Sequence, residues 1–170
     1  RGLLEARTGF DAVSARLVDI LDMSGLLDFD PRRVRAFVRA LDAGLPAGLR
    51  APSGDLSVAF FDDAGIAGIH ADFMNNPDPT DVITFEGEPE DCFAGEICAC
   101  AETALKRAGE FGSTPSRELC LYVAHGYLHL AGVDDISPED AAKMRAAEAA
   151  ALAVLDAKFR KPVFNFKVTK

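Results

Sequence analysis

The segment Leu119–Leu130 (LCLYVAHGYLHL) constrains the fold more than any other stretch of the chain. It is apolar on nearly every side, and a helix with this pattern is expected to lie inside the protein. The exceptions are His125 and His129, which are one helical turn apart and therefore share one face. Two buried imidazoles without a common partner would each lose hydrogen bonds to water, whereas a shared cation removes that cost because neutral imidazole binds zinc well. The pattern therefore predicts a buried helix that carries a metal site.

The residues after this helix supply a third ligand. The spacing H-x-x-x-H-x-x-G-x-x-D matches that of the metzincin signature H-E-x-x-H-x-x-G-x-x-H, in which the glycine lets the chain turn back toward the metal. Asp135 occupies the last position and offers a carboxylate oxygen. Asp134 is an alternative ligand, although a role in bracing the turn explains it better. We therefore expect one zinc ion per chain, bound by His125, His129 and Asp135, with a fourth position open to water.

The residue that follows the first histidine is Gly126, where H-E-x-x-H peptidases carry their general base. Its absence argues against the standard peptidase mechanism, and a glycine here leaves room either for substrate or for a neighbouring strand. The residues thus indicate a metal-dependent hydrolase. A metal-bound water is its expected nucleophile, and the motif identifies no catalytic side chain. A metallopeptidase with metzincin spacing remains an alternative. The remaining histidine, His70, has no such partners and is expected at the surface or at a helix end.

The elements on either side of this helix predict the fold class. Strands are expected over residues 17–22, 56–61, 82–85 and 94–99, although the first could instead continue a helix from Phe10. Helices are expected from Asp30–Pro31 to the Pro/Gly loop at 44–54, from Asp62-Asp63 to about Phe73, and over 102–111. Two more are expected, one that starts at Thr114-Pro115 and runs over 118–130, and one from Ser137-Pro138 to about Phe159. This order is typical of an α+β fold in which a small mixed sheet packs against several helices. We expect one metallohydrolase domain over residues 1–170, with about the first ten residues disordered or a remnant of cloning.

The composition narrows the function classes. The net charge of −9 and the pI near 4.8 are unusual for a nucleic-acid-binding protein. The candidate basic patches are Arg32-Arg33-Arg35-Arg39 and Lys158-Arg160-Lys161, for which a solvated surface is the simpler explanation. No apolar run approaches the roughly 18 residues that span a bilayer, so we expect no membrane contact.

The cysteines are Cys92, Cys98, Cys100 and Cys120, and none forms a C-x-x-C pair. They are best explained as core thiols in a reducing cytoplasm. Cys98 and Cys100 would share one face of a strand, so a thiolate metal site is a less favoured alternative.

Several motifs in sequence order resemble those of one family, the bacterial YbeY endoribonucleases, also called rRNA maturation factors. The strongest match is His125–Asp135 (HGYLHLAGVDD), which resembles the family pattern H-G-x-L-H-L-x-G-y-D-H. Pro79–Phe85 (PTDVITF) resembles the segment P-T-D-V-L-S-F. Shorter matches are Leu56-Ser57-Val58, Gly95-Glu96-Ile97, Arg117-Glu118-Leu119, and Met144 with Glu148. The resemblance extends from about Leu17 to Leu155.

The resemblance implies a zinc-dependent endoribonuclease specific for single-stranded RNA, which acts in the cytoplasm in rRNA maturation and ribosome quality control. The implied partners are rRNA in the small ribosomal subunit and ribosomal proteins. Thr80, Asp81 and Arg117 are the candidates for substrate binding, and Asp81 and Arg117 also for support of catalysis. Asp81 and Arg117 can equally be explained as a turn residue and a surface residue.

Two departures from the family pattern bear on catalysis. Asp135 stands where the family has a third histidine, and the added negative charge is expected to make zinc a weaker Lewis acid. Met74 and Asn76 stand at positions that are commonly basic in the family, so stabilisation of a developing phosphorane is reduced. Arg117 or Lys106 could supply a replacement cation. A non-catalytic ribosome-associated factor with a structural metal is therefore a further alternative.

Overall fold

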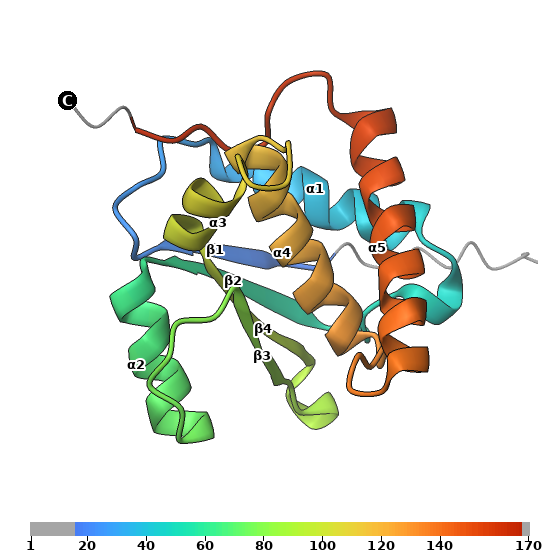
Figure 1. Ribbon diagram of the computed structural model, residues 1–170. Coiled ribbons are helices and arrows are strands. Elements are labelled where there is room, and N and C mark those ends of the chain that lie inside the picture. Colours follow the sequence, from blue (N-terminus) through green and yellow to red (C-terminus); the bar gives the residue numbers. More distant parts are fainter. Residues whose placement is uncertain (1–15, 168–170) are drawn as a thin grey trace, which may run out of the picture.

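The computed structural model describes residues 16–167, and these residues form a four-stranded mixed sheet with helices on both faces (Figure 1). The strands are β1 (Val18–Asp22), β2 (Asp55–Phe61), β3 (Val82–Glu86) and β4 (Phe93–Cys100), and their order in the sheet is β1-β2-β4-β3. β1 pairs with β2 and β2 with β4 in parallel, whereas β3 is antiparallel to β4. The expected α+β class with a mixed sheet is confirmed.

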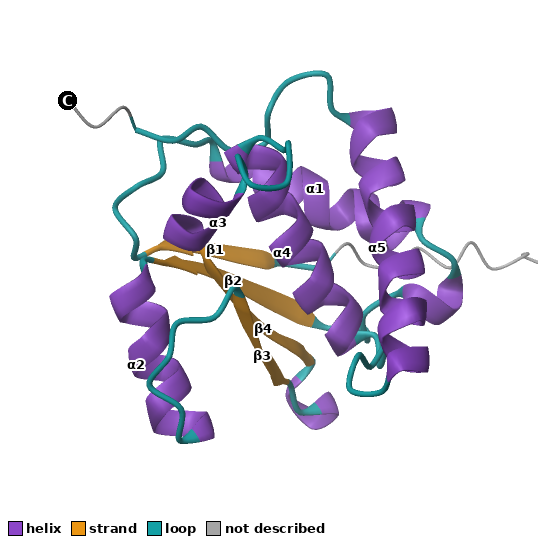
Figure 2. Cartoon of the chain, in the orientation of Figure 1, coloured by secondary structure: helices purple, strands orange, loops and turns teal. Residues whose placement is uncertain are grey.

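Within residues 16–167, five α-helices pack around the sheet (Figure 2). They are α1 (Pro31–Gly44), α2 (Asp63–Met74), α3 (Ala101–Arg107), α4 (Pro115–Leu130) and α5 (Pro138–Lys158). Short 3-10 turns lie at Ala47–Leu49 and Pro89–Asp91. α4 packs against β3, β4, α3 and α5, and α1 packs against β1 and α5. The metal-site helix α4 is therefore at the centre of the larger layer, as its apolar sequence predicted.

Side-chain caps fix the helix starts that the sequence indicated. Asp30, Asp62, Thr114 and Ser137 each accept a hydrogen bond from a backbone N–H in the first turn of the helix that follows. The helix expected over 102–111 is wrong in its length, because α3 ends at Arg107. Ser113 N–H donates to Ala108 O, and Gly112 adopts a φ of +62°, so a tight turn replaces the last predicted helical turn.

The two faces of the sheet bury separate apolar clusters. Ile97 of β4 faces α4, whereas its neighbour Cys98 faces α2 because side chains alternate along a strand. Ile66 of α2 closes the smaller cluster over Cys98 and Cys100. Burial, with a contribution from Glu96, raises the pKa of the Cys98 thiol to about 12, and burial raises the pKa of Cys100 to about 11. These thiols are held protonated, as expected for core residues rather than metal ligands.

No helix within residues 16–167 is long and apolar enough to cross a bilayer. The expectation for the first ten residues lies outside the described residues, and one domain over 1–170 stays a prediction.

Candidate metal centre

The two histidines of α4 turn the same ring nitrogen toward each other. His125 Nε2 and His129 Nε2 are 2.8 Å apart, and the rings meet edge to face at 82° with centroids 4.4 Å apart. Their side chains are 21% and 27% exposed, so both rings are reachable from solvent although the helix around them is buried. In this arrangement the Nε2 atoms of both rings are directed at one point.

The chain after α4 returns Asp135 to the same point. Gly132, at a φ of +86°, donates its N–H to His129 O, and Val133 N–H donates to Leu128 O, which together form a Schellman motif. Only glycine adopts this backbone conformation readily, so the stop glycine of the sequence pattern is required by the turn. Asp135 Oδ2 then lies 3.5 Å from His125 Nε2 and 3.7 Å from His129 Nε2.

Asp134, the alternative ligand, is used differently. Its Oδ1 accepts hydrogen bonds from the backbone N–H of Asp135 at 2.7 Å and of Ile136 at 3.3 Å. The carboxylate braces the turn that presents Asp135. In the part of the chain that the structure describes, the group of possible ligand atoms that lie within 4.8 Å of one another comes from His125, His129 and Asp135.

These three atoms fit a zinc ion. Zinc at about 2.0–2.2 Å from nitrogen and oxygen ligands in tetrahedral geometry implies ligand atoms roughly 3.4 Å apart. The two Asp135 distances, 3.5 and 3.7 Å, are close to that value, and the two imidazole nitrogens at 2.8 Å need to separate slightly. Two imidazoles and one carboxylate are also a donor set that zinc accepts, with a fourth position left for water. The residues present therefore form a possible metal-binding group.

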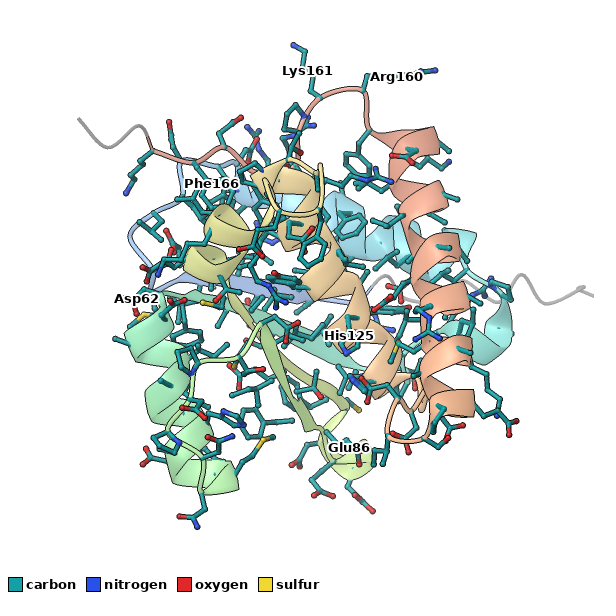
Figure 3. The ribbon with its side chains drawn as sticks, in the orientation of Figure 1. Asp62, Glu86, His125, Arg160, Lys161 and Phe166 are labelled. Atoms are coloured by element: carbon teal, nitrogen blue, oxygen red, sulfur yellow. The ribbon has the colours of Figure 1, made fainter. Side chains whose placement is uncertain are left out.

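Glu148 of α5 contacts His125 at Nδ1, the ring nitrogen that does not face the other histidine. Its Oε1 lies 2.6 Å from His125 Nδ1, so a protonated Nδ1 donates to the carboxylate and leaves Nε2 free as a ligand (Figure 3 labels His125 on α4, beside α5). Burial lowers the pKa of His125, but the Glu148 carboxylate, with Asp81 and Asp135, outweighs it and raises the pKa above its ordinary value. Sequence reasoning gave Glu148 no role, although it was part of the family resemblance.

Asp81 lies within electrostatic range of the centre, and Thr80 lies beside it. The Asp81 carboxylate contributes to the raised pKa of His125. Its Oδ1 accepts hydrogen bonds from Thr80 Oγ1 at 3.2 Å and from Val82 N–H at 2.9 Å. Asp81 therefore caps the start of β3 and adds negative charge near the histidines, and Thr80 is tied to Asp81.

Gly126 lies where α4 touches the sheet. A Cβ at this position would be 2.7 Å from Ile97 Cγ2 and 3.1 Å from the Cγ2 atoms of Thr84 and Val82. The glycine therefore leaves room for the neighbouring strands, one of the two explanations that the sequence left open. A glutamate at this position, the base of H-E-x-x-H peptidases, would clash with these side chains of β3 and β4.

The basic candidates lie elsewhere. Arg117 is about two turns before His125 on α4, roughly 12 Å away along the helix axis, and binds Asp156 of α5 through both guanidinium NH groups. Lys106 is paired with Asp63 and Glu102. Met74 ends α2 and Asn76 follows it in the turn. Neither Arg117 nor Lys106 therefore supplies a cation next to the two histidines.

Comparison with known proteins identifies relatives. The family model for Endoribonuclease YbeY matches residues 31–156. Endoribonuclease YbeY of Rhodopirellula baltica is 45% identical over 105 residues, which cover 60% of this chain and 54% of that protein. Endoribonuclease YbeY of Pelotomaculum thermopropionicum is 31% identical over 137 residues, which cover 76% of this chain and 90% of that protein.

A solved structure has the same fold. The solution structure of TM1509 from Thermotoga maritima superposes with a TM-score of 0.55 at 25% identity, covering 83% of this chain and 93% of that one. The match with the Rhodopirellula protein spans little more than half of that relative's length, and the match with the Mycolicibacterium gilvum protein spans 59% of it.

Proposed function

The chain belongs to the Endoribonuclease YbeY family, and we propose that it is a zinc-dependent endoribonuclease specific for single-stranded RNA. The observation that carries this proposal is the convergence of His125 Nε2, His129 Nε2 and Asp135 Oδ2 within 4.8 Å. We further propose that it acts in the cytoplasm, on rRNA of the small ribosomal subunit, in rRNA maturation and ribosome quality control. Ribosomal proteins would help to bring this acidic chain to its RNA, since a net charge of −9 opposes the approach of a polyanion.

The chain's own residues divide the work of the centre between them. His125, His129 and Asp135 would hold zinc, which when bound supplies a Lewis acid that activates water for attack on phosphorus. Glu148 fixes the ring of His125 through Nδ1 and so keeps Nε2 aimed at the ligand position. Asp134 holds the turn that presents Asp135. Gly126 lets α4 rest on β3 and β4, which sets the height of both histidines above the sheet.

Zinc-dependent cleavage by this protein can be distinguished from cleavage by a contaminating nuclease. The purified protein should bind about one zinc ion, and His125→Ala should lose both zinc and the cleavage of single-stranded RNA. The matched control is His70→Ala, because His70 lies on α2 and its Nδ1 contacts Asp78 O at 2.7 Å, outside the centre. The control should keep zinc and activity. RNA cleavage that survives in a folded His125→Ala protein would contradict the proposal.

The negative surroundings of the centre favour a second candidate, a ribosome-associated factor in which the metal is structural. Asp81, Asp135 and Glu148 all act on His125, and Met74 and Asn76 carry no charge where a cation would help a phosphorane. Ribosome association that persists in zinc-loaded protein without any RNA cleavage would favour this candidate over the nuclease.

A further inference from the structure

The second basic patch of the sequence lies at the C-terminal end of α5, the end that is away from the metal centre. Lys158 ends the helix, and Arg160 and Lys161 follow in the loop; these three residues are called the basic end below. Figure 3 shows Arg160 and Lys161 projecting outward from this loop, away from His125. All three side chains are exposed. Within residues 16–167, none of their charged groups lies within 4 Å of a carboxylate, so their charges are available.

Arg33 of α1 joins this loop to the first basic patch of the sequence. Its Nη2 donates to Lys161 O at 2.6 Å and its Nε to Pro162 O at 3.1 Å. Its guanidinium also lies 5.8 Å from the ring centroid of Phe159, whose other neighbour is Phe37. The loop is therefore fastened to α1, and Arg160 and Lys161 are held in place rather than carried on a free tail. Arg35 of the first patch is used differently, since its Nε donates to Val18 O, and Arg32 is paired with Asp30.

The basic end borders a hollow suited to phosphate. A hollow of about 200 Å³ lies between the start of α4 and the end of α5. Its polar lining comes from Thr114, Ser116, Arg117, Asp156, Arg160 and Lys161. Arg117 neutralises Asp156 there. Lysine, arginine and hydroxyl side chains are the groups that most often contact nucleic-acid phosphates.

We propose that the basic end binds the phosphate backbone of an RNA strand whose other part lies at the metal centre. This inference rests on the proposed RNA substrate. On a chain with a net charge of −9, a group of exposed cations without carboxylate partners gives a polyanion a local site of attraction. An acidic protein would use the same charges. The hollow beside them favours phosphate, because the hydroxyls of Thr114 and Ser116, which accept from Arg117 N–H and Phe164 N–H, keep an O–H to donate.

The helix pair fixes the separation of the two sites. α4 and α5 meet at His125–Glu148 in the centre and at Arg117–Asp156 next to the basic end. From Glu148 to Lys158 the helix rises about 15 Å. A stacked strand advances roughly 3.4 Å per nucleotide, so a strand must extend roughly four or five nucleotides from the centre to reach Lys158. Shorter RNA would occupy the centre without touching the basic end.

The test measures RNA binding against salt with the zinc-loaded protein and a phosphorothioate-linked strand well beyond that length, whose integrity is checked after each measurement. Removing two phosphate contacts in Arg160→Gln/Lys161→Gln should make the slope of log K against log salt shallower by about 1.4, and should weaken binding on the order of 25-fold at about 0.1 M salt. The matched control is Arg39→Gln, an exposed arginine of α1 outside this loop, which should change neither. A strand of about three nucleotides should bind wild type and double variant alike.

An unchanged slope in the double variant, an equal loss in Arg39→Gln, or an equal loss with the short strand would overturn the inference. Loss of binding to a ribosomal protein with RNA binding intact would overturn it in favour of a protein partner. These outcomes are independent of cleavage, so a protein that binds RNA in this way but never cuts it would refute the proposed function alone.

Discussion

His125 Nδ1 and Glu148 Oε1 are 2.6 Å apart, and this contact joins the metal-site helix to the last helix of the fold. The loop between these two helices carries Asp135, so the candidate centre is built from consecutive elements, α4, the turn at Gly132 and α5. The sheet supports it from below through Gly126 and adds the charge of Asp81. Zinc affinity should therefore depend on contacts within the α4–α5 pair as much as on the three ligands.

Removal of Glu148 should weaken zinc binding. Loss of a carboxylate that orients a metal-binding histidine typically lowers metal affinity about 10–100-fold, so the zinc affinity of Glu148→Ala should fall by about this factor. Glu148→Gln should lose less, because its amide oxygen still accepts from Nδ1. Competition with a chelating zinc indicator measures the change. Glu139→Ala, an exposed carboxylate on the same helix, should have no effect, and wild-type affinity in Glu148→Ala would count against this role.

The two neighbouring aspartates should behave differently. Asp135→Asn removes a charged ligand and should reduce zinc affinity strongly. Asp134→Asn should keep it, because an amide oxygen can still accept from the backbone N–H groups of Asp135 and Ile136. The same zinc competition decides between them, and the reverse order of affinities would identify Asp134 as the ligand.

Asp135→His should raise the rate of RNA cleavage per bound zinc. A neutral imidazole in place of a carboxylate leaves more positive charge on the metal and makes it a stronger Lewis acid. Rates normalised to measured zinc content isolate this effect from affinity. A variant that is loaded with zinc yet no faster than wild type would show that this charge does not limit the reaction.

Gly126→Ala should destabilise the fold although alanine favours helices. The new methyl would lie 2.7 Å from Ile97 Cγ2, and such overpacking costs about 1–3 kcal/mol, more than the gain of up to about 1 kcal/mol in helix propensity. Gly68→Ala in α2 is the matched control, because nothing lies within 4 Å of its Cβ position. That control should be stabilising. Denaturant unfolding measures both, and a stabilised Gly126→Ala protein would refute the close approach of α4 to the sheet.

The metal-free protein should lose stability as pH rises through the titration of His125. Its folded-state pKa is raised above the ordinary value of 6.5, where the unfolded state titrates. The stabilising contribution is therefore complete below about 6.5 and disappears above the folded-state pKa. Glu148→Gln should flatten this dependence when the denaturant midpoint is followed against pH in chelator. Zinc binding should show the opposite trend, because protons must leave the ligands. A pH-independent difference between the two proteins would contradict this account.

Sequence spacing predicted the part of the site that lies within one helix and its turn. His125 and His129 share a face by helical periodicity, and Gly132 marks the turn that returns Asp135. Glu148 was beyond this reasoning, since its contact depends on how α5 packs on α4 and leaves no spacing signal. The same holds for Gly126, whose neighbours come from β3 and β4.

Two further differences have local causes. The helix expected to reach Phe111 ends at Arg107, because the turn before α4 depends on backbone hydrogen bonds and on Gly112 rather than on apolar periodicity. Arg117 was a candidate for the centre because of its place in the motif order. Its distance from His125 follows from their spacing on one helix and was available from the sequence, whereas its pair with Asp156 follows only from the packing of α5 on α4.

Anomalous diffraction at the zinc edge from crystals of the zinc-loaded protein tests the central claim most directly. The account predicts one strong peak at about 2.0–2.2 Å from His125 Nε2, His129 Nε2 and an oxygen of Asp135, with Glu148 still bound to Nδ1. A zinc peak at other residues, or none between these three side chains in protein that carries zinc in solution, would contradict it.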